Sequence, residues 1–330
     1  MKNVIVVSDA GLDPDDVVAI LCLAKAHKQG LINLLGFVGN LYPAHKRSAL
    51  IKTVLVECGL ENIPVGIGTD CNQVRKVKPY EFAIDLVEYA RLEKIGEDLI
   101  YSLLVDADHK SVSLLLISGL TDIARLMIKY PSLLVDKVKE IYVMGGARFS
   151  EDSLIIDNTA SNNKFDLDSA HIFHSEAIKL GMPLNILTRF AAYECFVDKK
   201  FYDQLATRHK VGAYLQNIQK SSITSLWEYA NNQPTTERQN RQWFCNTFCG
   251  QDNIPIASTE SPWEFIKGFS LYDPATVVWM LLPDYFQPLS LVIKDTKHSI
   301  VGVSAESNGV VNGHNIINKI EELANDIYKF

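Results

Sequence analysis

The chain has 330 residues, of which 47% are hydrophobic and 22% charged, a composition typical of globular proteins. Its net charge of −7 and isoelectric point of about 5.6 argue against a nucleic-acid-binding surface, and no apolar run reaches the roughly 18 residues of a membrane span. Because no basic, cleavable export segment precedes the first apolar run, we expect a cytoplasmic protein that binds neither nucleic acid nor membrane.

Short apolar runs alternate with helical patterns through the first part of the chain. The runs are nearly continuous and of strand length, at Val4–Val7, Leu34–Val38, Leu114–Ile117, Ile141–Met144 and Leu184–Leu187. Helical patterns follow at Asp15–Lys28, Ala44–Cys58 and Leu120–Lys129. Continuous apolar runs are typical of strands covered on both faces, so the alternation predicts an α/β fold with a mainly parallel, doubly wound sheet.

The pattern changes beyond about residue 195. Residues 228–253 are polar with aromatic islands, whereas a strand-like run and a helical pattern return at 289–294 and 315–329. We therefore expect a single domain over residues 1–330 with a long helical and loop insertion at roughly 195–270.

The six cysteines are scattered and form no zinc-binding spacing, so we expect reduced structural thiols. Three histidines with polar neighbours, His109, His209 and His298, are expected at the surface.

Four aspartates follow the first predicted strand, namely Asp9, Asp13, Asp15 and Asp16. Open α/β sheets bind ligands at the carboxyl ends of their strands, and several carboxylates together suit a hard cation such as Ca²⁺ or Mg²⁺. The alternative is a solvated turn that starts a helix, with Asp13 as the cap residue and Pro14 at the first helical position. A helix start accounts for one or two of the aspartates but not for Asp9.

Further motifs come at later strand ends and helix starts. They are LLGFVGN, which ends in Asn40; LLLISGLTDIARLM, which contains Ser118; IYVMGGA, which contains Met144; NNKFDLDSAHIF, which contains Asn162; and LYDPATVVWML, which contains Asp273. Singly, each has a structural explanation as a tight strand end or a helix start. Together with DAGLDPDD, and in this order from residue 3 to about 281, they resemble the motifs of the inosine–uridine-preferring nucleoside hydrolase family.

The resemblance implies Ca²⁺-dependent hydrolysis of the N-glycosidic bond of a ribonucleoside or of a 5′-substituted ribosyl derivative. It implies that Asp9, Asp16, Asp273 and the backbone carbonyl of Ser118 hold the calcium, with Asp9 also acting as general base. The residues that it places on the small-molecule ribosyl substrate are Asp15, Asn40, Met144, Asn158 and Asn162. The family also implies a homodimer or homotetramer.

Two positions depart from the family's pattern. Tyr272 stands where the family has a histidine that is a candidate leaving-group acid, and a phenol with pKa near 10 is a weaker proton donor at neutral pH. We assign Tyr272 to the catalytic positions together with Asp9. Ala160 stands where the family has a glutamate on the 5′-hydroxyl side of the sugar, with Arg148 and Lys164 nearby in sequence.

The missing glutamate suggests a ligand with a 5′-phosphate, unless Asp157 or Asn158 replaces it. The departures leave open a non-catalytic binder of a nucleotide or ADP-ribose-like ligand that keeps the metal pocket. The insertion and Tyr272 also resemble a divergent branch of the family that includes effectors injected by plant-pathogenic bacteria, which would imply secretion without a cleavable signal. A phosphohydrolase with Asp9 as nucleophile is disfavoured, because Gly11 occupies the place of its second aspartate.

Overall fold

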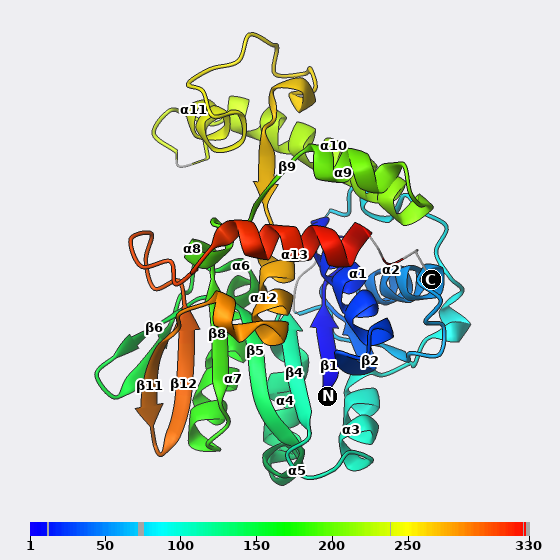
Figure 1. Ribbon diagram of the computed structural model, residues 1–330, viewed down its shortest axis with the longest axis vertical. Coiled ribbons are helices and arrows are strands. Elements are labelled where there is room, and N and C mark those ends of the chain that lie inside the picture. Colours follow the sequence, from blue (N-terminus) through cyan, green and yellow to red (C-terminus); the bar gives the residue numbers. More distant parts are fainter. Residues whose placement is uncertain (12, 72–75, 238, 326, 328–330) are drawn as a thin grey trace.

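The centre of the fold is an eight-stranded sheet with the strand order β11-β12-β8-β5-β4-β1-β2-β3 (Figure 1). In this computed structural model, residues 1–11, 13–71, 76–237, 239–325 and 327 are described. The strands of the sheet are β1 (Lys2–Ser8), β2 (Ile32–Gly39), β3 (Val65–Ile67), β4 (Val112–Ile117), β5 (Val138–Gly145), β8 (Leu184–Thr188), β11 (Leu289–Ile293) and β12 (Thr296–Val301). Only the β11–β12 pair is antiparallel within this described sheet.

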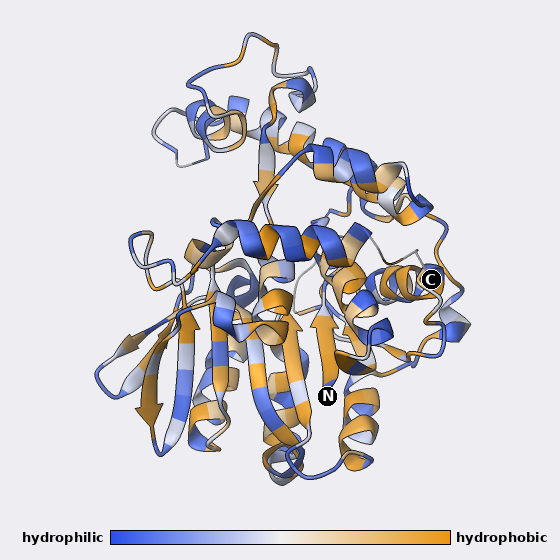
Figure 2. Ribbon diagram, in the orientation of Figure 1, coloured by the Kyte–Doolittle hydropathy of each residue, from blue (hydrophilic) through white to orange (hydrophobic). Residues whose placement is uncertain are grey.

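Helices cover both faces of the sheet, as the continuous apolar runs predict. Along β1, Val4 and Val6 join one hydrophobic cluster, while Ile5 and Val7 join the other. The first face carries α1 (Asp15–Lys28), α2 (Ala44–Glu57), α12 (Tyr272–Leu281) and α13 (Gly313–Asn325). The second carries α3 (Gly96–Val105), α4 (Thr121–Lys129), α5 (Pro131–Lys137) and α7 (Leu167–Lys179). The apolar strands between these layers stand out in Figure 2, and the predicted α/β, mainly parallel, doubly wound fold is confirmed.

A helical lobe stands beyond the carboxyl ends of the parallel strands (Figure 1). It is joined to the body by a two-stranded antiparallel ribbon of β9 (Phe196–Asp198) and β10 (Gly268–Ser270). Its helices are α9 (Lys200–Ala206), α10 (Lys210–Asn231), α11 (Arg241–Phe244) and the π-helical turn η3 (Cys245–Cys249), with the short 3₁₀ turn η4 (Trp263–Phe265). Trp227 is fully buried there, with its ring 5.0 Å from that of Phe244, so aromatic side chains form the core of the lobe.

The remaining elements are short. They are the hairpin β6 (Ala147–Ser150) and β7 (Ser153–Ile156), the helices α6 (Ser161–Lys164) and α8 (Arg189–Ala192), and the 3₁₀ turns η1 (Pro79–Phe82), η2 (Tyr89–Arg91) and η5 (Pro283–Tyr285). The strand predicted in the tail is β11 and the last predicted helix is α13, although the predicted end of that helix at Lys329 lies outside the described residues.

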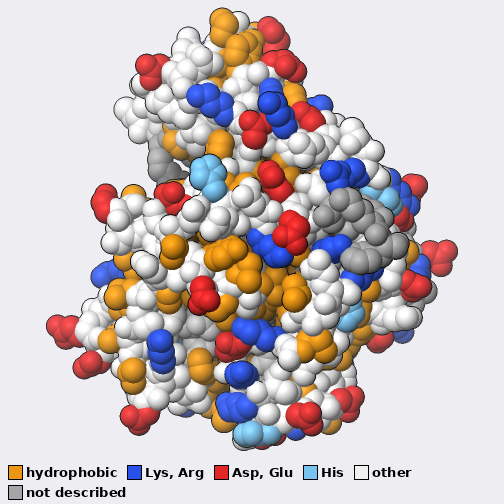
Figure 3. All heavy atoms as spheres, viewed as in Figure 1, with side chains coloured by type: hydrophobic (Ala, Val, Ile, Leu, Met, Phe, Trp, Pro, Cys, Tyr) orange, Lys and Arg blue, Asp and Glu red, His pale blue; other side chains and the backbone are white. Residues whose placement is uncertain are grey.

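Surface and interior follow most of the sequence-based expectations. All six cysteines are free and buried. Among the described residues, no helix combines the length and apolar character needed to cross a bilayer. On the face drawn in Figure 3, Lys and Arg side chains lie among Asp and Glu side chains. The surface expectation for His298 is wrong: its polar neighbours belong to β12, a strand inside the sheet, and the histidine is fully buried.

Candidate functional site

Three carboxylates meet at the carboxyl ends of the central strands. One oxygen from each of Asp15, Asp16 and Asp273 lies within 4.8 Å of the others. Asp15 and Asp16 begin α1, and Asp273 lies in the first turn of α12, so two helix N-termini face the cluster. Asp15 Oδ2 accepts hydrogen bonds from the backbone N–H groups of Tyr272 (3.2 Å) and Asp273 (3.5 Å). Residues 257 positions apart are therefore joined at this point.

Burial and mutual repulsion make these carboxylates difficult to ionise together. Burial is the largest cause that raises the pKa of Asp15 to about 7, with Asp13 and Asp9 adding repulsion. The pKa values of Asp16 and Asp273 are raised well above their ordinary range by burial and by the neighbouring aspartates. A divalent cation would remove this repulsion, and the donors are all oxygens, as Ca²⁺ and Mg²⁺ require. The residues present therefore fit a hard cation.

Asp9 lies beside this cluster, at the end of β1. Its side chain is buried, and its charge raises the pKa values of both Asp16 and Asp273. Asp16 Oδ1 accepts hydrogen bonds from the Ser8 hydroxyl (2.6 Å) and from the backbone N–H of Asp9 (3.1 Å), which fixes the loop to the start of α1. Gly11 has φ +102°, a conformation that favours glycine, so the chain turns tightly two residues after Asp9.

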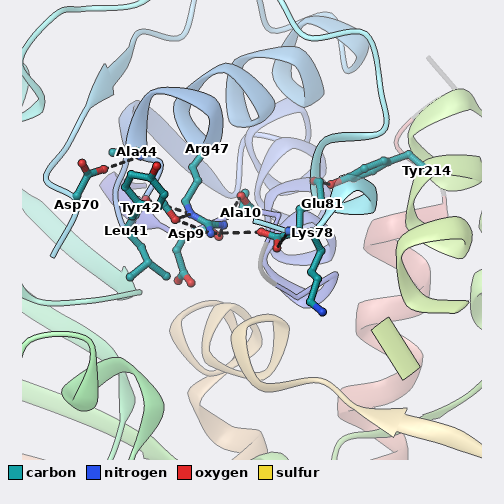
Figure 4. A network of polar contacts seen from close by, with 10 residues as sticks. All are labelled: Asp9, Ala10, Leu41, Tyr42, Ala44, Arg47, Asp70, Lys78, Glu81 and Tyr214. Carbon is teal, nitrogen blue, oxygen red and sulfur yellow. Dashed lines mark hydrogen bonds and ion pairs between the residues drawn. The ribbon is translucent and has the colours of Figure 1, made fainter. Parts of the chain in front are cut away.

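The fully buried Arg47 of α2 holds the loop from behind (Figure 4). Its Nη1 donates to the backbone carbonyls of Asp9 (2.7 Å) and Ala10 (3.1 Å), and its Nε donates to that of Leu41 (3.0 Å). Nη2 lies 3.5 Å from Oε2 of Glu81, which is also buried. The guanidinium places a positive charge below the aspartates and acts to lower the pKa of Asp16, against the larger effect of burial.

The aspartates lie in a cavity of about 900 Å³ between the body and the lobe. Its wall combines the ends of the sheet strands with side chains from α8, α10, the lobe turns and α12. Aromatic lining residues are Phe165, Tyr193, Phe196, Tyr202, Trp243, Phe248, Phe269 and Tyr272. A volume in the upper part of the roughly 300–1,000 Å³ range of small-molecule pockets suits a large small-molecule ligand.

Several residues predicted for the sugar are brought together. Met144 and Asn162 both line the cavity, and the Asn162 side-chain amide donates to the Met144 carbonyl (3.0 Å). Asp15, also expected at the sugar, lies in the carboxylate cluster. Asn158 is exposed and is not among the described lining residues.

Asn40 and Ser118 are paired with each other instead of lining the cavity. The Asn40 Nδ2 donates to the Gly119 carbonyl and to Asp122 Oδ2, both at 2.8 Å, and its Oδ1 accepts from the Ser118 hydroxyl. Asp122 is buried, and it also accepts from Thr69. The predicted metal-binding role of Ser118 concerns its backbone carbonyl, which these side-chain contacts do not involve, so that role stays a prediction.

Tyr272 lies next to Asp273 and lines the cavity, with its ring centroid 6.2 Å from that of Tyr193. Burial raises the pKa of Tyr272 further above its ordinary value of 10, so the phenol keeps its proton at neutral pH. It can donate a hydrogen bond or stack on a ring, but it is a poor general acid.

Arg189 was not found by sequence reasoning. It follows directly after β8, and it lines the cavity with Thr159 and Ala160. The rule that ligands bind at strand ends, which drew attention to Asp9, would also have selected Arg189. The expected nearby cations, Arg148 and Lys164, are instead exposed and are not among the described lining residues.

Comparisons with known proteins show which family and which solved structures the chain resembles. The profile of the family described as inosine-uridine preferring nucleoside hydrolase matches residues 4–323. The type III effector protein XopQ, solved in complex with adenosine diphosphate ribose, has a TM-score of 0.84 and 26% identity, over 99% of this chain and 94% of its own. The effector protein XOO4466 has a TM-score of 0.85 and 26% identity, over 99% and 93% of the two chains.

A purine-preferring ribonucleoside hydrolase from Gardnerella vaginalis shares the fold, with a TM-score of 0.65 and 16% identity over 98% of this chain and 99% of its own. No match was found among proteins with curated descriptions.

Proposed function

This chain belongs to the inosine–uridine-preferring nucleoside hydrolase family, and we propose that it binds a ribosyl ligand, with ADP-ribose as the first candidate, through a divalent cation. Asp15, Asp16 and Asp273 would hold the cation, with Asp9 beside it. The observation that carries the proposal is the approach of the three carboxylates to within 4.8 Å at the floor of a large cavity. A bound Ca²⁺ would offset their charge and offer coordination positions to sugar hydroxyls.

The ligand class is supported by a relative and by the size and aromatic lining of the cavity. XopQ, at 26% identity over nearly the full length of both chains, was solved with adenosine diphosphate ribose. A cavity of about 900 Å³ with aromatic side chains along its wall offers room and stacking surfaces for such an extended ligand. Met144 and Asn162 are joined by a hydrogen bond, so both are held in place on the side of the cavity where the sugar would bind.

Binding without efficient cleavage is favoured by the residue beside Asp273. Leaving-group protonation at neutral pH needs an acid with a pKa near 7, whereas burial raises the pKa of Tyr272 above 10. Among the described lining residues no histidine stands in for the missing imidazole. The phenol can orient or stack on the ligand, which is a binding role.

Hydrolysis of the N-glycosidic bond is the second candidate, and the buried Asp9 favours it. Its carboxylate lies beside the cluster and could take a proton from an attacking water. The other aspartates would stabilise the positive charge that develops on the sugar ring. Ligands with a good leaving group, which need no acid, would then be cleaved fastest.

Calorimetric titration with ADP-ribose tests the proposal. We expect binding in Ca²⁺ that is lost in EDTA, and at least a tenfold weaker affinity for Asp273→Asn. Asp284→Asn is the matched control, because this carboxylate is exposed on η5 and absent from the cavity wall. Absence of binding, or binding unaffected by EDTA and by Asp273→Asn, would overturn the proposal. Release of base or reducing sugar that depends on Asp9 would favour hydrolysis.

A further inference from the structure

The cavity holds one cationic side chain among many acidic ones. Five aspartates line it, namely Asp9, Asp13, Asp15, Asp16 and Asp273. Arg189 is the only lysine, arginine or histidine among the described residues that line the cavity. A guanidinium placed in such a cavity must either neutralise protein carboxylates or bind an acidic part of the ligand.

The contacts of Arg189 leave much of its guanidinium available. Its Nη2 donates to Asp157 Oδ2 (2.5 Å) and to Thr159 Oγ1 (2.6 Å). Among the described residues, no hydrogen bond comes from its Nε or Nη1, although a guanidinium carries five N–H donors. Arg189 lines the cavity, and its side chain is 19% exposed, so it is only partly hydrated.

Asp157 and Thr159 hold Arg189 in place while leaving its other edge open. Asp157 Oδ1 accepts from the backbone N–H (2.8 Å) and the hydroxyl (2.6 Å) of Thr159, which fixes the carboxylate in a turn. Only its second oxygen contacts the guanidinium. The pair is therefore a positioned Arg with spare donors, the arrangement that recognises a phosphate oxygen.

Ala160 adds a second observation. It is buried, lines the same cavity, and lies between Thr159 and the short helix α6. A methyl group at this position adds no second negative charge to that of Asp157, whereas the glutamate that the family resemblance leads us to expect would add one and repel an anion.

Arg189 also lies on the side of the cavity where the sugar is expected. Thr188, the residue before Arg189, pairs with Gly145 in the sheet, so Arg189 lies beside the strand end that carries Met144. Tyr193, which follows α8, packs its ring 6.2 Å from that of Tyr272. A ligand whose ribose is held near Asp273 can therefore place a group attached to that ribose beside Arg189.

We propose that Arg189, positioned by Asp157 and Thr159, is a specificity-determining residue that selects ligands with a phosphate group attached to the ribose over the free nucleoside. This inference rests on the proposed function and names the ligand class for the same site. Thr159 and Asp157 act as positioning residues, and the absence of a carboxylate at position 160 permits the anion to approach.

The test compares ADP-ribose, AMP and adenosine in calorimetric titrations with Ca²⁺, using wild-type protein, Arg189→Gln and Ala160→Glu. Loss of a charge-assisted contact predicts 10- to 100-fold weaker binding of ADP-ribose and AMP by Arg189→Gln, with less than a twofold change for adenosine. Ala160→Glu keeps Arg189 and should likewise weaken the binding of ADP-ribose and AMP more than that of adenosine. Arg148→Gln is the matched control, an exposed arginine absent from the described cavity wall that should bind like wild type.

Equal losses for adenosine and its phosphorylated relatives in both variants would overturn the inference and leave the proposed function intact. So would wild-type protein that binds adenosine as tightly as ADP-ribose. Wild-type protein that binds none of the three ligands would overturn both. If Arg189→Gln does not fold, Ala160→Glu decides the question alone, since an unchanged preference in that variant contradicts the role of charge at this wall.

Discussion

Replacement of Arg47 by methionine removes the cation behind the acidic loop while keeping a side chain of similar length. The guanidinium is fully buried and donates to the carbonyls of Asp9, Ala10, Leu41 and Tyr42, besides its ion pair with Glu81. We expect Arg47→Met to lower the free energy of unfolding, because these acceptors would remain buried without their donor.

The magnitude follows from the charge left behind. Removal of one partner from a buried ion pair costs about 3–5 kcal/mol, because the other charge stays uncompensated. Glu81 is 1% exposed, and its Oε1 still accepts from the Lys78 backbone N–H (2.7 Å), so it cannot move into water without breaking the loop. The double variant Arg47→Met/Glu81→Gln removes both charges. Its loss in free energy of unfolding should be smaller than the sum of the two single losses, by at least about 1.5 kcal/mol.

Urea unfolding followed by tryptophan fluorescence, in EDTA, measures these differences, and the chain has four tryptophans to report them. Arg148→Met is the control, because an exposed arginine should change stability by no more than about 0.5 kcal/mol. A loss below about 1 kcal/mol for Arg47→Met, or single and double changes that simply add, would refute the reasoning.

Three further results are expected. The pKa of Asp15, raised to about 7, implies that this group stabilises the metal-free protein at low pH and that the stabilisation is lost as pH rises through 7. Thermal melts in EDTA should therefore show lower stability at pH 8 than at pH 5. The difference should be smaller in Asp15→Asn, and Ca²⁺ should oppose the loss at pH 8. Burial lowers the pKa of His174 from 6.5 to about 4, so stability should fall as pH drops from 6.5 towards 4, by at most about 3 kcal/mol, and His174→Leu should flatten that part of a pH-dependent urea series. Tyr272→His should raise the rate of base release from purine nucleosides at least tenfold over wild type, whereas Tyr272→Phe should not; equal rates in all three proteins would contradict the assignment of an acid role to this position.

Local pattern predicted the elements whose ends are marked in the sequence. Helix α1 runs over Asp15–Lys28, the range that the helical pattern predicted, although Pro14 rather than Asp13 occupies the cap position. The central strands were found because both of their faces are apolar. The short strands β6, β7, β9 and β10 were not found, since runs of three or four residues carry too little periodicity to predict.

The sequence also predicted only part of the candidate site. Motif order placed Asp9, Asp16 and Asp273 in one region, and the structure brings the last two together with Asp15. The direction in which a side chain points depends on partners distant in sequence. The hydrogen bonds of the Asn40 side chain with Gly119, Ser118 and Asp122 could therefore not be predicted. The contacts of Arg189 could not be predicted either, because Asp157 and Thr159 follow β7, 32 and 30 residues earlier in the chain.

The cluster of carboxylates also joins two segments that lie 257 residues apart in the sequence. Asp15 and Asp16 begin the first helix, while Asp273 begins the next-to-last one, and their meeting closes a loop that contains the whole lobe. A cation bound there would act as a reversible cross-link, with a strength set by the concentration of free ion rather than by redox potential. Such a link exists only after residue 273 has been synthesised, so ion binding would report that synthesis has passed that residue.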